Sequence, residues 1–323
     1  MSEIIAKDIT FVLTLKDRFE DTENWIKYNL YPEYNYLIAD GSIGNENRDI
    51  FKNLYNENID YVYCGPDLNI EQYLKKIYNS IRMVNTKYVM LCDNDDYINR
   101  IGINECIYIL NRNSEYTCSG GTIFSVFKNK TINNFFNIPI PFLNNSKLHN
   151  LDDKFKAFIE SRTEYKYLWY SVYRKESLEK IWLDIISLKI YDLFLVEMLY
   201  SDLALYSGKY FDIGRNHYVR LMNTNSSGAN MSGAFYHKKI FFDSNYRNEL
   251  LKINKFYANL YAKSVSEIES AQSLFYLGYF NNQPRVKNGV YRKFHGLLVK
   301  FQLFDIKICI KVLNIFYSLK KIF

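Results

Sequence analysis

The sequence has few cysteines, and their spacing fits no metal site. The set contains Cys64, Cys92, Cys106, Cys118 and Cys309. It includes no CxxC pair, and an odd, scattered set is typical of reduced thiols in a cytosolic compartment. The composition therefore excludes a small disulfide-stapled scaffold and a cysteine-based metal site.

Long apolar runs are also missing. Glu3 precedes the first apolar run, and no small-residue cleavage site follows that run, so we expect no secretory signal. Near the C-terminus, lysines interrupt the apolar stretches every few residues. No stretch there reaches the roughly 18–20 apolar residues that a membrane-spanning helix needs. We therefore expect a cytoplasmic protein without a spanning segment.

Glycine-rich nucleotide motifs and internal repeats are absent too. The sequence contains neither a P-loop signature (GxxxxGK followed by Ser or Thr) nor GxGxxG, which leaves the P-loop and dinucleotide-binding classes without support. The 323 residues are 48% hydrophobic and 24% charged, so the chain is not disordered. It has room for one large α/β domain, or for a domain of about 200–240 residues with an appendage.

The net charge of +6 is unevenly distributed. Residues 285–323 hold nine Lys and Arg residues and one acidic residue, Asp305, so the rest of the chain is nearly neutral. A nucleic-acid-binding domain usually carries its positive charge on the folded body. We therefore expect no nucleic-acid partner.

Short apolar strands alternate with helical stretches over the first hundred residues. Such alternation predicts an α/β fold with a parallel sheet and right-handed crossovers. The predicted strands are 9–15, 36–39, 61–63 and 88–92, and the predicted helices are 22–30, 48–56 and 70–84.

The middle of the chain is less regular, and the pattern becomes helical again toward the end. Gly208 follows a long apolar stretch and predicts a helix C-terminus there. The further predictions are a strand within 116–127, a loop over 129–150, a helix over 183–206, a strand over 210–213, a polar loop over 218–234 and helices from 238 onward.

An acidic motif, Asp93-Asn94-Asp95-Asp96, follows the predicted strand 88–92. Ligands of open α/β sheets bind beyond the carboxyl ends of the strands. Three neighbouring carboxylates repel one another unless a cation lies among them, and Mn²⁺ or Mg²⁺ with phosphate oxygens meets that need. The alternative is a solvated acidic turn that caps a helix.

Two other classes that use paired aspartates do not fit the motif. A haloacid-type phosphatase needs Thr or Val two residues after its second Asp, but Asp95 is followed by Asp96 and Tyr97. An EF-hand needs a further oxygen ligand, a glycine and a distal Glu, and Tyr97, Ile98 and Asn104 stand there instead.

The order of three short motifs, each after a predicted strand, resembles the GT-A glycosyltransferases. The motifs are TLKDR (14–18), ADGS (39–42) and CDNDD (92–96), and the likeness covers about residues 8–220. It is closest to the family-2-like group of bacterial surface-polysaccharide enzymes. The resemblance implies a GT-A-like (Rossmann-like), mostly parallel sheet flanked by helices. Residues 1–240 would form the catalytic domain, and residues 241–323 a helical extension ending in a basic amphipathic tail.

The resemblance also implies a nucleotide site and a metal site. The nucleotide would contact Thr14, Asp17, Arg18, Asp40, Gly41 and Ser42. Asp93 and Asp95 would hold Mn²⁺ or Mg²⁺ and the donor diphosphate, with Asp96 as a further or alternate ligand. Ala39 stands where the family often has the first of two aspartates.

The family's catalytic base lies in an acidic pair about 11 residues before a glycine. Glu197 stands 11 residues before Gly208, with Val196 in place of the partner acid, and Asp192 is the alternative base. A paired, half-buried helix residue is the competing interpretation of Glu197. We expect Asp202 to be an exposed helix residue.

His217 and Arg220 follow the predicted strand 210–213. Arg220 would clamp the donor diphosphate and His217 would complete the metal shell. A surface ion pair for Arg220 and a structural role for His217 are the alternatives.

The C-terminal tail has a basic stripe. Lys293, Lys300 and Lys307 recur every seven residues and Lys311 follows at four, although Phe304 falls beside the stripe. A basic amphipathic helix suits an anionic membrane surface. The alternative is a helix packed on the protein's own core.

These features predict a metal-dependent, inverting glycosyltransferase. It would move a sugar from a nucleotide-sugar donor to a glycan or lipid-linked acceptor, a surface-glycan precursor such as that of lipopolysaccharide or capsule. It would lie at the inner face of the cytoplasmic membrane. The alternatives are a nucleotidyl- or phosphotransferase with the same metal site, and a non-catalytic, membrane-attached scaffold in polysaccharide assembly.

Overall fold

The chain forms two compact units that alternate along the sequence. The first unit comprises Met1–Thr122 and Tyr167–Val219, and the second comprises Ile123–Lys166 and Arg220–Phe323. The computed structural model describes residues 7–52, 54, 57–127, 140–143, 152–163, 167–222, 239 and 243–282.

The first unit is built on a mixed β-sheet with the strand order β3-β2-β1-β4-β8-β6-β9-β5. The strands β3, β2, β1 and β4 run parallel to one another, whereas β8 is antiparallel to β4 and β6, and β5 to β9. The bounds are β1 Ile9–Leu15, β2 Asn35–Asp40, β3 Ile59–Tyr63, β4 Tyr88–Asp93, β5 Tyr97–Ile98, β6 Tyr116–Phe127, β8 Val172–Arg174 and β9 Lys209–Met222. The predicted α/β class and the predicted parallel strands are confirmed.

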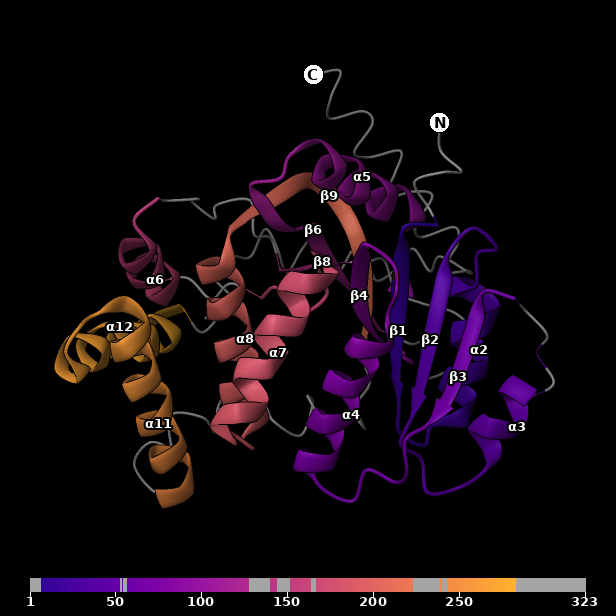
Figure 1. Cartoon of the computed structure of the whole chain (residues 1–323), viewed down its shortest axis with the longest axis horizontal. Coiled ribbons are helices and arrows are strands. Elements are labelled where there is room, and N and C mark those ends of the chain that lie inside the picture. Colours follow the sequence, from indigo (N-terminus) through magenta and orange to yellow (C-terminus); the bar gives the residue numbers. More distant parts are fainter. Residues whose placement is uncertain are drawn as a thin grey trace, which may run out of the picture. The chain divides into compact units, whose positions relative to one another are not determined.

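Helices flank this sheet. The bounds are α2 Phe19–Asn29, α3 Glu46–Lys52, α4 Ile70–Met83, α5 Arg100–Arg112, α7 Lys175–Leu188 and α8 Leu193–Ser207. α4 and α7 pack against the sheet and against each other, and α8 packs on α7 (Figure 1). Asn69 starts α4 by accepting a hydrogen bond from the Gln72 N–H, and Leu74, Ile77 and Ile81 bury one face of this helix at helical spacing.

Two predicted elements of the first unit differ from the structure. The helix predicted over 183–206 is two helices, because Lys189 adopts a left-handed φ of 51° after α7 and Asp192 caps the start of α8. Gly208 ends α8, as predicted. The loop predicted from residue 218 is wrong at its start, since Tyr218 and Val219 pair with β5 and β9 continues to Met222.

In the second unit, β6 pairs with the short strand β7 (Ile140–Leu143) through residues 123–125, so the loop predicted over 129–150 contains a strand. α12 (Val265–Asn282) packs against α6 (Lys154–Thr163) and α11 (Ser244–Tyr261). Aromatic rings pack in this helical cluster: the ring centroid of Phe158 lies 5.0 Å from that of Tyr257, edge to face, and 5.0 Å from that of Tyr261, in a tilted arrangement. The helices predicted after residue 238 are confirmed in the described part of the chain.

Among the described residues, no helix is both long enough and apolar enough to cross a bilayer. The basic stripe at Lys293, Lys300, Lys307 and Lys311 lies outside the described residues, as do Cys309 and residues 223–238. The predicted division of the chain at residue 240 stays a prediction.

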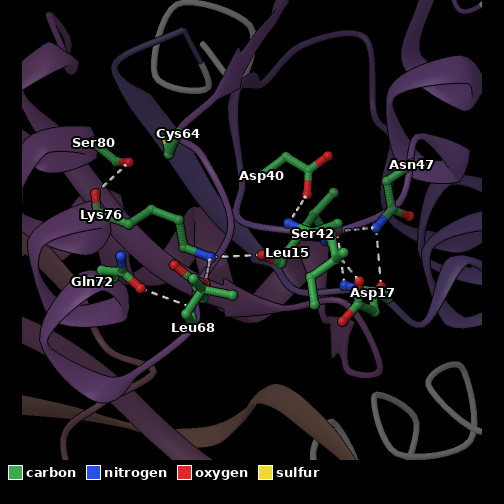
Figure 2. A network of polar contacts seen from close by, with 12 residues as sticks. Leu15, Asp17, Asp40, Ser42, Asn47, Cys64, Leu68, Gln72, Lys76 and Ser80 are labelled. Carbon is green, nitrogen blue, oxygen red and sulfur yellow. Dashed lines mark hydrogen bonds and ion pairs between the residues drawn. The ribbon is translucent and has the colours of Figure 1, made fainter.

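A buried ion pair joins α4 to the loop after β3, and its lysine also bonds to the end of β1. The side chains of Lys76 and Asp67 are 1% and 2% exposed, and the Lys76 ammonium donates to the Asp67 carboxylate and, at 2.6 Å, to the Leu15 carbonyl (Figure 2). Burial lowers the pKa of Lys76 and raises the pKa of Asp67, while each charge opposes the other's shift. Removal of either partner would leave the other as an uncompensated buried charge.

Replacement of one partner should therefore destabilise the fold. We expect Lys76→Met to lower the free energy of unfolding by about 3–5 kcal/mol, because it leaves a buried carboxylate without its cation. Urea denaturation measures this change. Lys75→Met is the matched control, since Lys75 on the same helix makes an exposed pair with Glu71, and it should change stability little. Equal effects of the two substitutions would contradict the role assigned to the buried pair.

Candidate functional site

The register of the sheet brings the three sequence motifs together. Thr14 of β1 lies between Ala39 of β2 and Asp93 of β4. Since the three strands are parallel, their carboxyl ends lie at one edge of the sheet. The TLKDR, ADGS and CDNDD motifs, each at the end of its strand, therefore form one site.

Hydrogen bonds tie the turn after β1 to the turn after β2 (Figure 2). The Ser42 hydroxyl oxygen accepts from the Asp17 N–H at 2.8 Å and from the Asn47 amide at 2.9 Å. The Asp40 carboxylate accepts from the Ser42 N–H at 2.9 Å and from the Tyr61 hydroxyl at 2.6 Å. Asp40, Ser42 and Asn47 are all buried, so these side chains hold the two turns in a fixed relation.

Position 41 has no room for a side chain, so it requires glycine. A Cβ atom there would lie 2.3 Å from a carboxylate oxygen of Asp67. The Gly41 N–H donates to the Leu15 carbonyl at 3.0 Å, and its carbonyl accepts from the Asp67 N–H at 2.8 Å. The Gly-Ser pair of the motif thus closes the turn tightly against β1 and the loop after β3.

The chain leaves β1 through a strained turn that directs Arg18 toward the acidic motif. Asp17 and Arg18 both adopt left-handed backbone conformations, with φ of 55° and 54°, which are rare for residues with a side chain. The Arg18 guanidinium donates to the Asp95 carboxylate at 2.6 Å. Burial acts to lower the pKa of Arg18, but the carboxylates of Asp95, Asp93 and Asp21 outweigh this effect and raise the pKa.

The three acids after β4 form a compact group. One carboxylate oxygen from each of Asp93, Asp95 and Asp96 lies within 4.8 Å of the others. Asp95 and Asp96 are buried. Asn94, between Asp93 and Asp95, donates to the Thr22 hydroxyl at 3.0 Å and to the Arg18 carbonyl at 3.2 Å. Oxygen ligands in this number and spacing fit a hard divalent cation such as Mn²⁺ or Mg²⁺.

Both ring nitrogens of His217 form hydrogen bonds to the backbone. Nδ1 accepts from the Gly121 N–H at 3.0 Å, so Nε2 carries the proton and donates to the Tyr170 carbonyl at 2.9 Å. The ring is 1% exposed, and burial lowers the pKa of His217 to about 4. Within the described residues, the acidic group contains the three aspartates and not His217. The geometry favours the structural role of His217.

Asp192 and Glu197 have different environments on α8. The Asp192 carboxylate accepts from the N–H groups of Phe194 and Leu195, at 3.1 and 3.2 Å, and so caps the helix. Glu197 is half-buried one turn further on. Asp202 is 4% exposed, so its predicted exposure is wrong, because α8 is buried on all sides from residue 198 to residue 204.

The charges of Asp93 and Glu197 both affect the hydroxyl group of Tyr73, a residue that sequence reasoning missed. Burial raises the pKa of the Tyr73 hydroxyl, and the charges of Asp93 and Glu197 add to this effect, while a hydrogen bond with the Thr14 side chain opposes it. The Asp93 and Glu197 carboxylates therefore act on the same hydroxyl group. Tyr73 lies on the amphipathic helix α4, where an aromatic side chain at helical spacing is indistinguishable from a core residue.

Arg220 is half-buried on β9 and belongs to the second unit of the chain. Its function as a diphosphate clamp stays a prediction.

Solved structures of one protein share this fold. The chain matches S. aureus TarS with 12% identity and a TM-score of 0.52, over 86% of this chain and 44% of that one. It matches TarS residues 1–349 in complex with UDP with 12% identity and a TM-score of 0.53, over 88% of this chain and 77% of that one. It matches the same fragment in complex with UDP-GlcNAc with 13% identity and a TM-score of 0.53, over 89% of this chain and 78% of that one.

The similarity between this chain and TarS is a similarity of fold. The GT-A-like fold predicted from the three motifs is confirmed. This chain spans less than half the length of the longer TarS structure. No protein-family model and no curated protein matches the chain.

The buried His217 should make stability depend on pH in a defined window. Its pKa is about 4 in the folded protein and about 6.5 in the unfolded chain. Between these values the unfolded chain binds the extra proton, so stability falls as the pH falls from about 6.5 to about 4. A shift of this size corresponds to about 3 kcal/mol.

The measurement is urea unfolding of the wild type and of His217→Gln across this pH range. We expect the stability advantage of the wild type to shrink by about 3 kcal/mol from pH 6.5 to pH 4. An advantage that stays constant over the range would mean that His217 is not held neutral by its surroundings.

Proposed function

We propose that the protein is a metal-dependent glycosyltransferase that uses a UDP-sugar donor. The observation that carries the proposal is the acidic group Asp93, Asp95 and Asp96 beside the turn of Asp40-Gly41-Ser42. The fold supports it, because it is shared with TarS, whose structures hold UDP and UDP-GlcNAc. The acceptor that we propose is a surface-glycan precursor.

The nucleotide would lie at the edge formed by β1 and β2. The proposed contacts are Thr14, Asp17, Arg18, Asp40, Gly41 and Ser42. Asp17, Asp40 and Ser42 already fix one another through hydrogen bonds, so this edge of the sheet is preorganised for binding. Arg18 instead pairs with Asp95.

A cation at the acidic group would compete with Arg18 for Asp95. When bound, Mn²⁺ or Mg²⁺ would neutralise the charge of the departing diphosphate. Arg18 would then be released toward the phosphate oxygens, which a guanidinium binds well. The ion pair with Asp95 thus keeps the positive charge of Arg18 at the point where the donor arrives.

For the transfer itself, we propose Glu197 as the base. The acceptor hydroxyl oxygen bonds to the anomeric carbon while the bond from that carbon to the diphosphate oxygen breaks, and Glu197 takes the hydroxyl proton. The resemblance to the GT-A glycosyltransferases supports this choice, because Glu197 stands 11 residues before Gly208. Asp192 is less suitable, since its carboxylate caps two backbone N–H groups of α8.

We further propose that the basic tail, residues 285–323, attaches the protein to an anionic membrane surface on the cytoplasmic side. This proposal rests on the sequence pattern of the tail. A membrane location would bring the enzyme to a lipid-linked acceptor.

The donor and metal sites can be tested together by thermal shift. The panel contains UDP-, GDP-, CMP-, dTDP- and CDP-type ligands, each with and without Mn²⁺. A ligand at 100 times its dissociation constant stabilises the folded state by about 2.7 kcal/mol. We expect stabilisation by UDP and UDP-sugars that depends on Mn²⁺, and its loss in Asp95→Asn.

The matched control is Asp49→Asn, since Asp49 makes an exposed ion pair with Lys52 on α3. This variant should respond to UDP and Mn²⁺ like the wild type. A wild type that no nucleotide stabilises, or an Asp95→Asn variant that responds fully, would refute the proposed site.

Glu197→Gln tests the base. We expect kcat to fall by about 10²–10⁴-fold, with the affinity for UDP and Mn²⁺ unchanged, because the amide cannot accept the proton but keeps the shape of the side chain. Steady-state kinetics and calorimetry measure the two quantities. Asp192→Asn serves as the comparison, and a larger loss of kcat in that variant would transfer the role of base to Asp192.

A further inference from the structure

Two stacked tyrosines hold the first aspartate of the acidic group. The rings of Tyr170 and Tyr218 lie 4.2 Å apart between centroids, with 18° between their planes, and both side chains are at most 1% exposed. The Tyr170 hydroxyl donates to the Oδ2 atom of Asp93. The Asp93 N–H donates a hydrogen bond to the Tyr218 hydroxyl oxygen at 3.3 Å.

The backbone of Tyr170 is itself anchored. Its carbonyl accepts from Nε2 of His217 at 2.9 Å, and His217 is held in turn by the Gly121 N–H. Two glycines make the approach possible. A Cβ atom at Gly120 would lie 3.2 Å from Nε2 of His217, and one at Gly121 would lie 2.1 Å from the Arg215 carbonyl oxygen. This explains why β6 contains a Gly-Gly pair at this level.

The hydrogen bond from the Tyr170 hydroxyl restricts the rotation of the Asp93 carboxylate. Asp93 is the last residue of β4, and the Tyr170 hydroxyl donates to one oxygen of its carboxylate. A buried hydroxyl with one fixed position restricts the rotation of the carboxylate group. Groups that orient a metal ligand in this way are worth about 10–100-fold in metal affinity.

We propose that Tyr170 is a positioning residue that sets the Asp93 carboxylate for a divalent cation, with Tyr218 and His217 fixing Tyr170. The proposal rests on the proposed function, because it assumes that the acidic group binds the metal. Tyr170 acts through Asp93 and touches no reacting atom.

The test is the affinity of Mn²⁺ in the presence of UDP, measured by the electron paramagnetic resonance signal of free Mn²⁺. We expect Tyr170→Phe to weaken Mn²⁺ binding by about 10–100-fold. The phenylalanine ring keeps the stack on Tyr218, so the variant should fold. Tyr218→Phe, which leaves the bond from Tyr170 to Asp93 in place, should lose less affinity than Tyr170→Phe.

Tyr173→Phe is the matched control. Tyr173 lies three residues further along, is fully buried, and donates its hydroxyl to the Leu168 carbonyl at 2.9 Å instead of to Asp93. This variant should bind Mn²⁺ like the wild type, although it loses the buried hydrogen bond to the Leu168 carbonyl.

The outcomes separate the two claims. If the wild type binds no Mn²⁺ with UDP, the proposed function fails and the role of Tyr170 fails with it. If the wild type binds Mn²⁺ and Tyr170→Phe binds it equally well, only the positioning role is overturned. An equal loss in Tyr173→Phe also overturns it, because the effect would then come from general destabilisation.

Discussion

The parallel pairing of β1 with β2 and β4 is the constraint on which the site depends. It places Thr14 between Ala39 and Asp93, so the chain leaves all three strands at the same edge of the sheet. A shift of one residue in either pairing would turn the side chains of that strand to the opposite face. The buried, β-branched residues of β1 prevent such a shift, because both faces of this strand are covered.

Negative charge is concentrated at that edge, and the fold offsets it in several ways. Arg18 pairs with Asp95, hydroxyl groups of Tyr61 and Tyr170 donate to Asp40 and Asp93, and Lys76 neutralises Asp67. Each contact belongs to a different carboxylate, so the acids are stabilised individually. The acidic group nevertheless keeps three carboxylates within reach of one ion, and a bound cation would relieve the repulsion that remains.

Much of the site could be predicted from the sequence because its parts are local. Apolar runs mark β1 and β4, and the motif that ends each strand follows directly in the chain. The contacts that sequence reasoning missed join distant segments. The hydrogen bond from Tyr170 to Asp93 joins residues 77 positions apart in the sequence. The hydrogen bonds of His217 go to backbone groups of distant residues, which residue spacing does not predict. The same limit explains the wrong exposure of Asp202. The break between α7 and α8 has a local cause: Lys189 ends α7 in a left-handed conformation and Asp192 caps the start of α8, within a segment whose helical pattern looks continuous.

The most direct test of the account is anomalous X-ray diffraction from crystals grown with UDP and Mn²⁺. We expect one strong manganese peak between the carboxylates of Asp93 and Asp95, adjoining the diphosphate. We also expect that Arg18 no longer pairs with Asp95. UDP bound at this edge without a manganese peak, or manganese bound elsewhere while Arg18 stays on Asp95, would contradict the central claim that the acidic group holds the donor through a metal ion.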